Sequence, residues 1–206
     1  MRNPEASELP PGAFAKPMDL VLASTSPRRI DLLTSQGYTF RIVPPGVEES
    51  VAGHFSAREL SLLNAKRKAY AVAVFEPTSI VIGADTVVSI HGETLGKPVD
   101  LDDARSMLQK LNGRTHQVLT SVWVTRLHPF HIVAFTETSE VTFHLLSPRE
   151  IDAYLQKINP LDKAGAYAAQ EHRDDIIQHI EGSENNVIGL PIESVVLALA
   201  EFKAAT

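Results

Sequence analysis

The residues Ser24-Thr-Ser-Pro-Arg-Arg29 have the types and the spacing of an anion site. They follow a short apolar run, residues 19–23, which is typical of a buried strand. The Ser26-Pro27 pair predicts a helix start with serine as its cap, and the free N–H groups of a helix start attract anions. Arg28 and Arg29 add guanidinium groups that suit phosphate oxygens. The segment is therefore a candidate phosphate-binding turn.

A second copy of the Ser-Pro-Arg string, Ser147-Pro-Arg-Glu150, provides an internal comparison. It has the pattern of a capping box, in which Ser and Glu satisfy free N–H groups at a helix start. The first copy differs in the strand before it and in a second Arg in place of Glu. On these residues alone, 24–29 are either an ordinary helix start or an anion site.

Asp85 lies in an apolar stretch, between Val81-Ile82 and Val87-Val88. Burying an unpaired carboxylate is costly, so Asp85 must have a partner or a metal. It is either an aspartate in a turn at a strand end or a functional carboxylate. A functional carboxylate here would bind a divalent metal or take a proton from water.

Further acidic and basic residues supply both charge types that phosphoanhydride hydrolysis needs. Magnesium prefers one or two carboxylates plus substrate oxygens, so Asp85 with Glu49 would suffice. A single lysine is more often a solvated surface residue, but neighbouring Gly and Pro residues hold Lys97 and Lys163 on fixed turns. His116 could line the same pocket, and we assign it no catalytic role. The charged set comprises Glu48, Glu49, Lys68, Lys97 and Lys163.

Strand-like and helix-like segments alternate at first, and the middle of the chain looks antiparallel. This pattern predicts a mixed α/β sheet of α+β type. Helices are expected to start at Ser26, Ser56, Leu101, Ser147 and Pro191. Strands are expected over residues 19–23, 38–43, 79–90, 116–125, 132–143 and 175–180, with the fourth and fifth paired as a hairpin.

The composition excludes several classes of protein. A net charge of −6 argues against binding of a nucleic-acid polymer, and the lack of cysteine excludes disulfides, thiolate metal sites and a cysteine nucleophile. No apolar run approaches the ~18 residues of a membrane helix. Residues 1–17 lack the apolar stretch of a signal peptide. We expect a flexible extension over 1–17, a single domain over 18–206 and a cytoplasmic location.

Taken in order along the chain, these segments resemble the Maf family of nucleotide pyrophosphatases. The resemblance covers about residues 19–200 and rests on eight motifs. The motifs are Leu22-ASTSPRRIDL-Leu33, Val47-Glu-Glu49, Ala65-KRK-Ala69, Gly83-ADTV-Val88, Gly96-Lys-Pro98, Gly113-RTHQVL-Thr120, Asp162-KAGAYAA-Gln170 and Asn186-VIGL-Pro191.

The resemblance implies a two-lobed fold like that of the inosine-triphosphate pyrophosphatases, with a central mixed sheet and a cleft between the lobes. It also implies a divalent metal, Mg²⁺ or Mn²⁺, and a homodimer. Asp85 falls on the general-base position of the family. The positions that handle phosphate and metal are Ser24, Arg28, Glu49, Lys68, Lys97 and Lys163.

Three positions sort this family by substrate, and here they are Arg29, Thr86 and Gln170. The subfamily with these residues prefers dTTP and UTP, whereas the sister pattern, which acts on 7-methyl-GTP, has Trp after the Pro and Gln after the Asp. The chain departs from the family in two places. Glu48 replaces an Asp and keeps the charge, and residues 171–175 replace a Gly-rich stretch next to Gln170, which bears on base choice.

The resulting hypothesis is hydrolysis of dTTP and UTP, with modified pyrimidine nucleotides as possible substrates, to the monophosphate and pyrophosphate. The triphosphate would lie across residues 24–29, and Thr86 and Gln170 would read the edge of the pyrimidine. One alternative is a pyrophosphatase for another base, such as ITP or XTP. A second alternative is a nucleotide-binding regulator of cell division without catalysis. A panel of nucleotides assayed for pyrophosphate release distinguishes the three.

Overall fold

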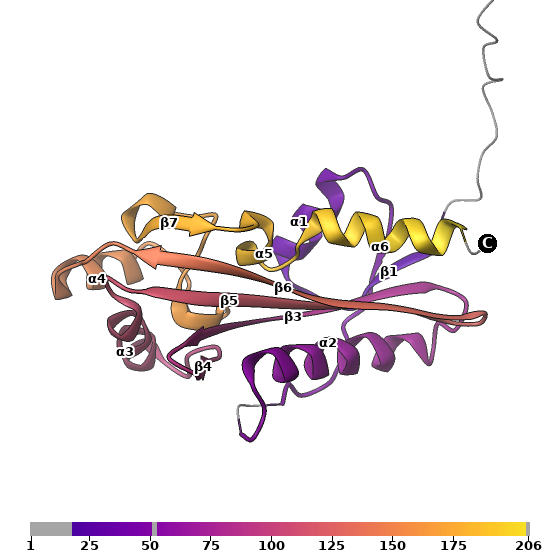
Figure 1. Ribbon diagram of the computed structural model, residues 1–206, viewed down its shortest axis with the longest axis horizontal. Coiled ribbons are helices and arrows are strands. Elements are labelled where there is room, and N and C mark those ends of the chain that lie inside the picture. Colours follow the sequence, from indigo (N-terminus) through magenta and orange to yellow (C-terminus); the bar gives the residue numbers. More distant parts are fainter. Residues whose placement is uncertain (1–17, 51–52, 205–206) are drawn as a thin grey trace, which may run out of the picture.

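The computed structural model describes residues 18–50 and 53–204. The predicted extension over residues 1–17 lies outside the described residues. A mixed sheet of seven strands forms the centre of the molecule, in the order β2-β1-β3-β5-β6-β7, with β4 paired to β3 (Figure 1). The strands are β1 Leu20–Leu22, β2 Arg41–Ile42, β3 Ile80–Ile90, β4 Glu93–Leu95, β5 Thr115–Leu127, β6 Phe130–Phe143 and β7 Ile177–Glu181.

Strand β1 runs parallel to β2 and β3, and every other neighbouring pair in this sheet is antiparallel. The expected hairpin is confirmed, with β5 and β6 paired from Thr115 to Leu127. The helices are α1 Pro27–Ser35, α2 Ala57–Ala73, α3 Leu101–Leu111, α4 Pro148–Leu155, α5 Glu184–Ile188 and α6 Ile192–Ala204. Two 3-10 turns, Ala164–Ala166 and Arg173–Asp175, lie between α4 and β7.

Alternating residues of the first strands pack against helices on opposite faces of the sheet. Leu20 and Leu22 contact the core formed with α1 and α6, whereas Val21 contacts α2. This alternation follows from the two-residue period of a strand. Figure 1 shows the resulting layers, with α1 and α6 on one side of the sheet and α2 on the other.

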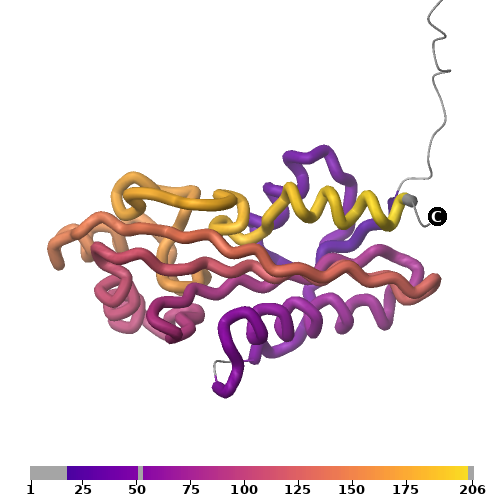
Figure 2. The backbone as a smooth tube through the Cα atoms, viewed as in Figure 1, coloured from indigo at the N-terminus to yellow at the C-terminus, as the bar shows by residue number. Residues whose placement is uncertain are grey.

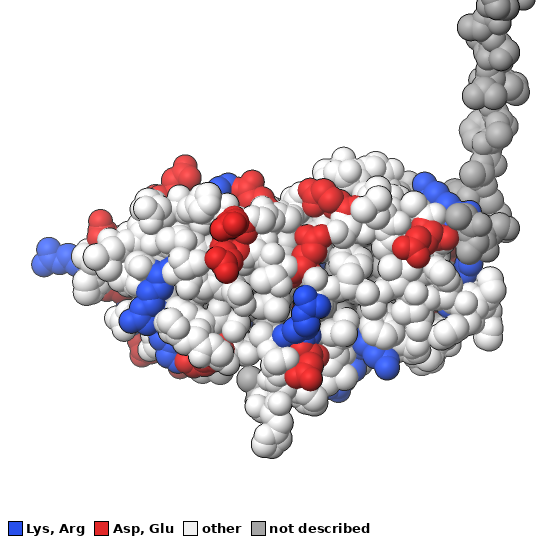
Figure 3. Space-filling model, in the orientation of Figure 1, with Lys and Arg blue, Asp and Glu red and all other residues white. Residues whose placement is uncertain are grey.

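The molecule has two lobes built on shared strands. The first lobe contains β1, β2, α1, α2 and α6, and the second contains β4, α3, α4 and β7 with a hydrophobic core of its own. Strands β3, β5 and β6 run the length of the molecule through both lobes (Figure 2). The predicted mixed, two-lobed fold is confirmed. Figure 3 shows acidic and basic side chains interspersed over one face of the molecule.

Helix α2 and strand β3 approach each other closely at Gly83. A Cβ atom added there would lie 2.4 Å from the main-chain O of Ala65 and 2.6 Å from the main-chain N of Ala69. Only glycine fits at this distance, because the contacted atoms belong to the backbone of a helix. The close approach brings the middle of α2 directly over Asp85, two residues further along β3.

Two strand predictions began two or more residues before the observed elements. The strand expected over 38–43 is limited to β2, and the one expected over 175–180 begins at Ile177. The later start has a local cause, because Arg173–Asp175 form a 3-10 turn that delays the extended conformation.

Candidate active site

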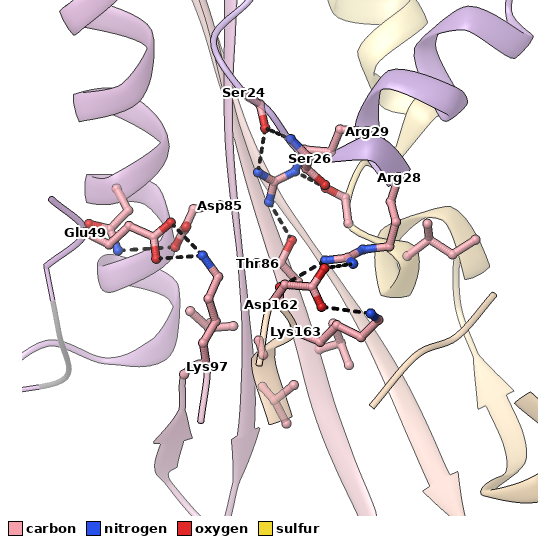
Figure 4. A pocket seen from close by; sticks show the side chains of 18 of the residues that line it. Ser24, Ser26, Arg28, Arg29, Glu49, Asp85, Thr86, Lys97, Asp162 and Lys163 are labelled. Carbon is pink, nitrogen blue, oxygen red and sulfur yellow. Dashed lines mark hydrogen bonds and ion pairs between the residues drawn. The ribbon is translucent and has the colours of Figure 1, made fainter. Parts of the chain in front are cut away.

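A cavity of about 740 Å³ opens between the lobes. Its wall is formed by the β1–α1 turn, the segment before α2, one face of α2 itself, the middle of β3, the segment after β4, and residues from 162 to 169 and from 187 to 189. Figure 4 shows the charged side chains of these segments pointing toward one another. The cavity therefore collects residues that are far apart in the sequence.

Lys68 is the centre of the acidic part of this cavity. Its Nζ lies 2.6 Å from Oδ1 of Asp85 and 2.7 Å from Oε1 of Glu49. Lys68 and Asp85 are buried, and Nδ2 of Asn64 donates to Oδ2 of Asp85 at 3.3 Å. The Asp85 carboxylate thus has partners on both oxygens, as the apolar surroundings of its strand require.

Glu49 receives a second ammonium group from the other side of the cavity. Nζ of Lys97 lies 3.4 Å from both carboxylate oxygens of Glu49. Partial burial alone would raise the pKa of Glu49, but the charges of Lys68 and Lys97 lower it below its usual value. Glu49 is therefore held as a carboxylate at the mouth of the site.

Asp85 and Glu49 fit a metal that is bound together with a phosphate substrate. Two carboxylates converge on one cavity, and Mg²⁺ binds one or two carboxylates plus substrate oxygens. Within residues 18–50 and 53–204, no group of three or more acidic or histidine side chains could hold a metal ion. The carboxylates of Asp85 and Glu49 thus suit an ion that takes its remaining ligands from a triphosphate, and they do not form a site made of protein ligands alone.

The two Ser-Pro-Arg copies differ in how their serines are used. Ser147 accepts from the N–H of Glu150 and completes its capping box, as does Ser56 at the start of α2. Ser26 is the N-cap residue of α1, as expected, but its side chain makes no capping hydrogen bond; its own N–H donates to Oγ of Ser24 at 3.2 Å. The first turn of α1 therefore receives no hydrogen bond from its N-cap side chain, unlike that of α4.

Asp162 joins cationic residues of both lobes across the cavity. Its carboxylate lies 3.3 Å from Nη1 of Arg28 in α1 and 2.8 Å from Nζ of Lys163. Partial burial would raise the pKa of Asp162, but the charges of Lys163 and Arg28 lower it below its usual value. Sequence analysis missed Asp162 as a site residue, although it stands directly before Lys163 in one of the motifs.

Arg29 points into the wall of the cavity and is held by three acceptors. Nε donates to the main-chain O of Gly189 at 2.8 Å, Nη1 to Oγ of Ser24 at 3.4 Å, and Nη2 to Oγ1 of Thr86 at 3.1 Å. Burial lowers the pKa of the Arg29 guanidinium from its usual value. The two arginines therefore have separate environments. Arg28 reaches across the cavity to Asp162, whereas the Arg29 side chain lies within the cavity wall.

The structure brings most predicted site residues to this cavity and leaves three outside its lining. Glu48 is exposed and does not line the cavity, in contrast to the neighbouring Glu49. Gln170 is exposed and is not a lining residue, although Ala169 is. His116 does not line the cavity; it is buried behind Tyr167, with Nε2 3.0 Å from the tyrosine Oη, and burial lowers its pKa to about 4. The predicted residues on the cavity wall are Ser24, Arg28, Arg29, Glu49, Lys68, Asp85, Thr86, Lys97 and Lys163.

Comparison with known proteins identifies the family. The family described as Maf-like protein matches residues 19–202. The chain belongs to the Maf family. The predicted resemblance is thereby confirmed.

Three similar Maf proteins share one name. The dTTP/UTP pyrophosphatase of Akkermansia muciniphila is 44% identical over 180 residues, which are 87% of this chain and 94% of that protein. The dTTP/UTP pyrophosphatase of Bacillus cereus is 43% identical over 183 residues, 89% of each chain. That of Bacillus anthracis is 42% identical over 89% of this chain and 95% of its own.

A solved structure supports the Maf fold. The Ham1 protein of Staphylococcus aureus has a TM-score of 0.50 and 17% identity, covering 90% of this chain and 99% of its own. At this identity the likeness shows the fold alone. Among the described residues, no helix is long and apolar enough to span a membrane.

Proposed function

We propose that this protein hydrolyses dTTP and UTP to the nucleoside monophosphate and pyrophosphate. The observation that carries the proposal is the position of Asp85, a buried carboxylate held by Lys68 in a cavity whose opposite side carries the Arg28 and Lys163 cations. Similar proteins at 42–44% identity are named dTTP/UTP pyrophosphatase, which supports this choice of substrates.

The proposed roles follow from where each group lies. The triphosphate lies along the β1–α1 turn, where Ser24 and the first turn of α1 face the cavity. Arg28, Lys97 and Lys163 offset the charge that develops on the pyrophosphate leaving group. Asp85 orients the attacking water and accepts its proton, and Lys68 fixes the position of the Asp85 carboxylate.

Asp85 and Glu49 are the residues that would hold Mg²⁺ or Mn²⁺. A divalent ion bound there supplies neutralisation of the phosphate oxygens. Glu49 is also the residue that joins Lys68 and Lys97, so its carboxylate links the buried and the exposed parts of the site. Base choice is proposed for Arg29 and Thr86 on the cavity wall, and for Gln170 on the family resemblance.

A nucleotide panel tests the proposal. The purified protein is incubated with dTTP, UTP, CTP, ITP and XTP, with and without Mg²⁺, and released pyrophosphate is measured. We expect kcat/KM for dTTP and UTP to exceed that for ITP and XTP by about 10²-fold or more, because a site that pairs polar groups of the base rejects a mismatched base strongly. Release mainly from ITP would support the purine pyrophosphatase instead. Tight binding of UTP without release would support the regulator.

We also propose that the protein forms a homodimer and acts in the cytoplasm. The dimer rests on the family resemblance. Analytical ultracentrifugation at several protein concentrations tests the dimer, and a single species of 22.5 kDa would contradict it.

A further inference from the structure

A buried row of hydrogen bonds extends from the cavity wall through the sheet. Oγ1 of Thr86 lies 2.9 Å from Oγ1 of Thr120 on the neighbouring strand β5. Oγ1 of Thr120 lies 2.9 Å from the main-chain O of Asn186 in α5. Thr120 and Asn186 have no exposed surface, so water does not compete for these groups.

The direction of each hydrogen bond follows from the number of protons available. A carbonyl oxygen only accepts, so Thr120 donates its single hydroxyl proton to Asn186. Thr86 must then donate its own proton to Thr120. The oxygen of Thr86 in turn accepts a hydrogen bond from Nη2 of Arg29, because a guanidinium group can only donate. The order of donation is fixed as Arg29 to Thr86, Thr86 to Thr120, and Thr120 to Asn186.

This order changes the role of Thr86. Its hydroxyl proton is committed to Thr120, so Thr86 has no donor to offer a nucleotide. The expected direct reading of the base by Thr86 is therefore limited to accepting a hydrogen bond. Its other function is to hold the guanidinium of Arg29 in one orientation.

The segment around α5 holds both ends of this row. The main-chain O of Gly189 accepts from Nε of Arg29, and the main-chain O of Asn186 accepts from Thr120. Gly189 has a φ of 128°, which other residues rarely adopt, so glycine allows the backbone turn that presents this carbonyl to Arg29. One short segment thus supplies the first and the last acceptor.

The side chain of Asn186 attaches this segment to the sheet. Its Oδ1 accepts from the N–H of Thr120 at 3.1 Å, and its Nδ2 donates to the main-chain O of Val118 at 3.0 Å and to Oγ of Ser139 at 2.9 Å. Three hydrogen bonds without exposed surface fix the position of α5 relative to β5. The Asn186 carbonyl is therefore a stationary acceptor for Thr120.

We propose that Thr120 is a positioning residue for nucleotide selection, acting through Thr86 and Arg29. The inference rests on the proposed pyrophosphatase function. Arg29 has five N–H groups, of which three are used within the protein, so its remaining groups offer donors only. Because Arg29 lines the cavity, its remaining donors favour a base with carbonyl acceptors, as uracil and thymine have, over the amino group of cytosine.

The test is Thr120→Val, which keeps the shape of the side chain and removes the hydroxyl. We expect the ratio of kcat/KM for UTP to that for CTP to fall about tenfold, mainly through a higher KM for UTP, while kcat for UTP stays within about threefold. Thr120→Ser restores the hydroxyl and should restore the ratio. A ratio that is unchanged in Thr120→Val would overturn the inference.

Thr125→Val is the matched control. Thr125 lies on the same strand, is fully buried, and its hydroxyl has no hydrogen-bond partner within the described part of the chain. Its loss should leave the UTP to CTP ratio unchanged. An equal fall in this control would mean that selectivity responds to any change in β5, which contradicts a specific role for Thr120.

A double-mutant cycle covers the case in which Thr120→Val folds poorly. Thr86→Val and Thr120→Ala interrupt the same row, so their effects on the UTP to CTP ratio should be strongly non-additive. Additive effects would contradict the proposal that Thr86 and Thr120 act through one connected row of hydrogen bonds. Calorimetric binding of UTP and CTP gives the same ratio without turnover. If the wild type prefers UTP in binding but releases no pyrophosphate, the proposed function fails while the role of Thr120 is still tested.

Discussion

The ammonium nitrogen of Lys68 lies 2.6 Å from Oδ1 of Asp85, and both side chains are more than nine-tenths buried. The pair joins α2 to β3 at the point where Gly83 lets the helix and the strand approach. The proposed catalytic carboxylate therefore lies within a few residues of the tight contact between α2 and β3. Measuring both unfolding and pyrophosphate release for substitutions here distinguishes effects on the stability of the fold from effects on the chemistry of the site.

Asp85→Asn tests the chemistry. The amide keeps the size of the side chain and an oxygen for Lys68, but it cannot take a proton from water. We expect pyrophosphate release to fall by about 10²-fold or more, with an unchanged circular dichroism spectrum. Asp102→Asn, at an exposed carboxylate in α3, is the control. Normal turnover in Asp85→Asn would remove Asp85 from the mechanism.

Lys68→Met tests the stability of the pair. The substitution leaves Asp85 buried with only the long contact to Asn64, and breaking one side of a buried ion pair costs about 3–5 kcal/mol. Urea unfolding should show this loss, and Lys68→Met/Asp85→Asn should recover part of it. A double variant no more stable than Lys68→Met would mean that Lys68 supports the fold by other contacts.

Gly83→Ala tests the close approach of α2 and β3. The added methyl group would overlap the backbone of Ala65 and Ala69, and such overpacking costs about 1–3 kcal/mol. We expect a lower melting temperature together with weaker pyrophosphate release, because the Lys68–Asp85 distance must change. Gly53→Ala is the matched control, since a Cβ there meets no atom within 4 Å. Equal melting temperatures for the two variants would contradict the packing argument.

Asp162→Asn tests the counter-charge in the phosphate region. In the free protein Asp162 neutralises Arg28 and Lys163, so an incoming triphosphate must take over both cations. Removing the negative charge should lower the Kd for pyrophosphate about 5- to 10-fold and slow its release. Isothermal titration calorimetry measures the affinity directly. Weaker binding of pyrophosphate would instead show that Asp162 assists the substrate.

The buried His116 predicts a dependence of stability on pH. Burial lowers its pKa from 6.5 to about 4, so between these values the unfolded chain binds more protons than the folded protein. The free energy of unfolding must therefore fall as the pH decreases through this window, by about 2 kcal/mol between pH 7 and pH 5 from this residue. Urea unfolding of the wild type and His116→Gln at both pH values isolates the effect. An equal pH dependence in the two proteins would contradict it.

Sequence reasoning succeeded where the signal is local. The capping boxes at Ser56 and Ser147, the buried strand around Asp85 and the β5–β6 hairpin depend on neighbouring residues, and each is observed. The resemblance to the family then placed distant motifs in one site. The strand starting at Ile177 was placed too early, because a 3-10 turn before it has no strong local signature.

What sequence reasoning missed depends on contacts between distant segments. Asp162 and Arg28 are 134 positions apart, and Thr120 and Asn186 are 66 apart. No periodicity or spacing predicts which carboxylate or carbonyl will face a given donor across the fold. The exposed position of Gln170, outside the cavity lining, likewise had no local signal in the sequence.

The shared strands determine how the two lobes can move. Because β3, β5 and β6 pass through both lobes without interruption, the described chain offers no linker about which one lobe could rotate. Any change in the width of the cavity must bend several hydrogen-bonded strands together. The continuous sheet therefore resists bending and holds the two lobes at one spacing. We expect substrate entry and product exit to depend instead on side-chain bridges such as Arg28–Asp162, which can open without bending the sheet.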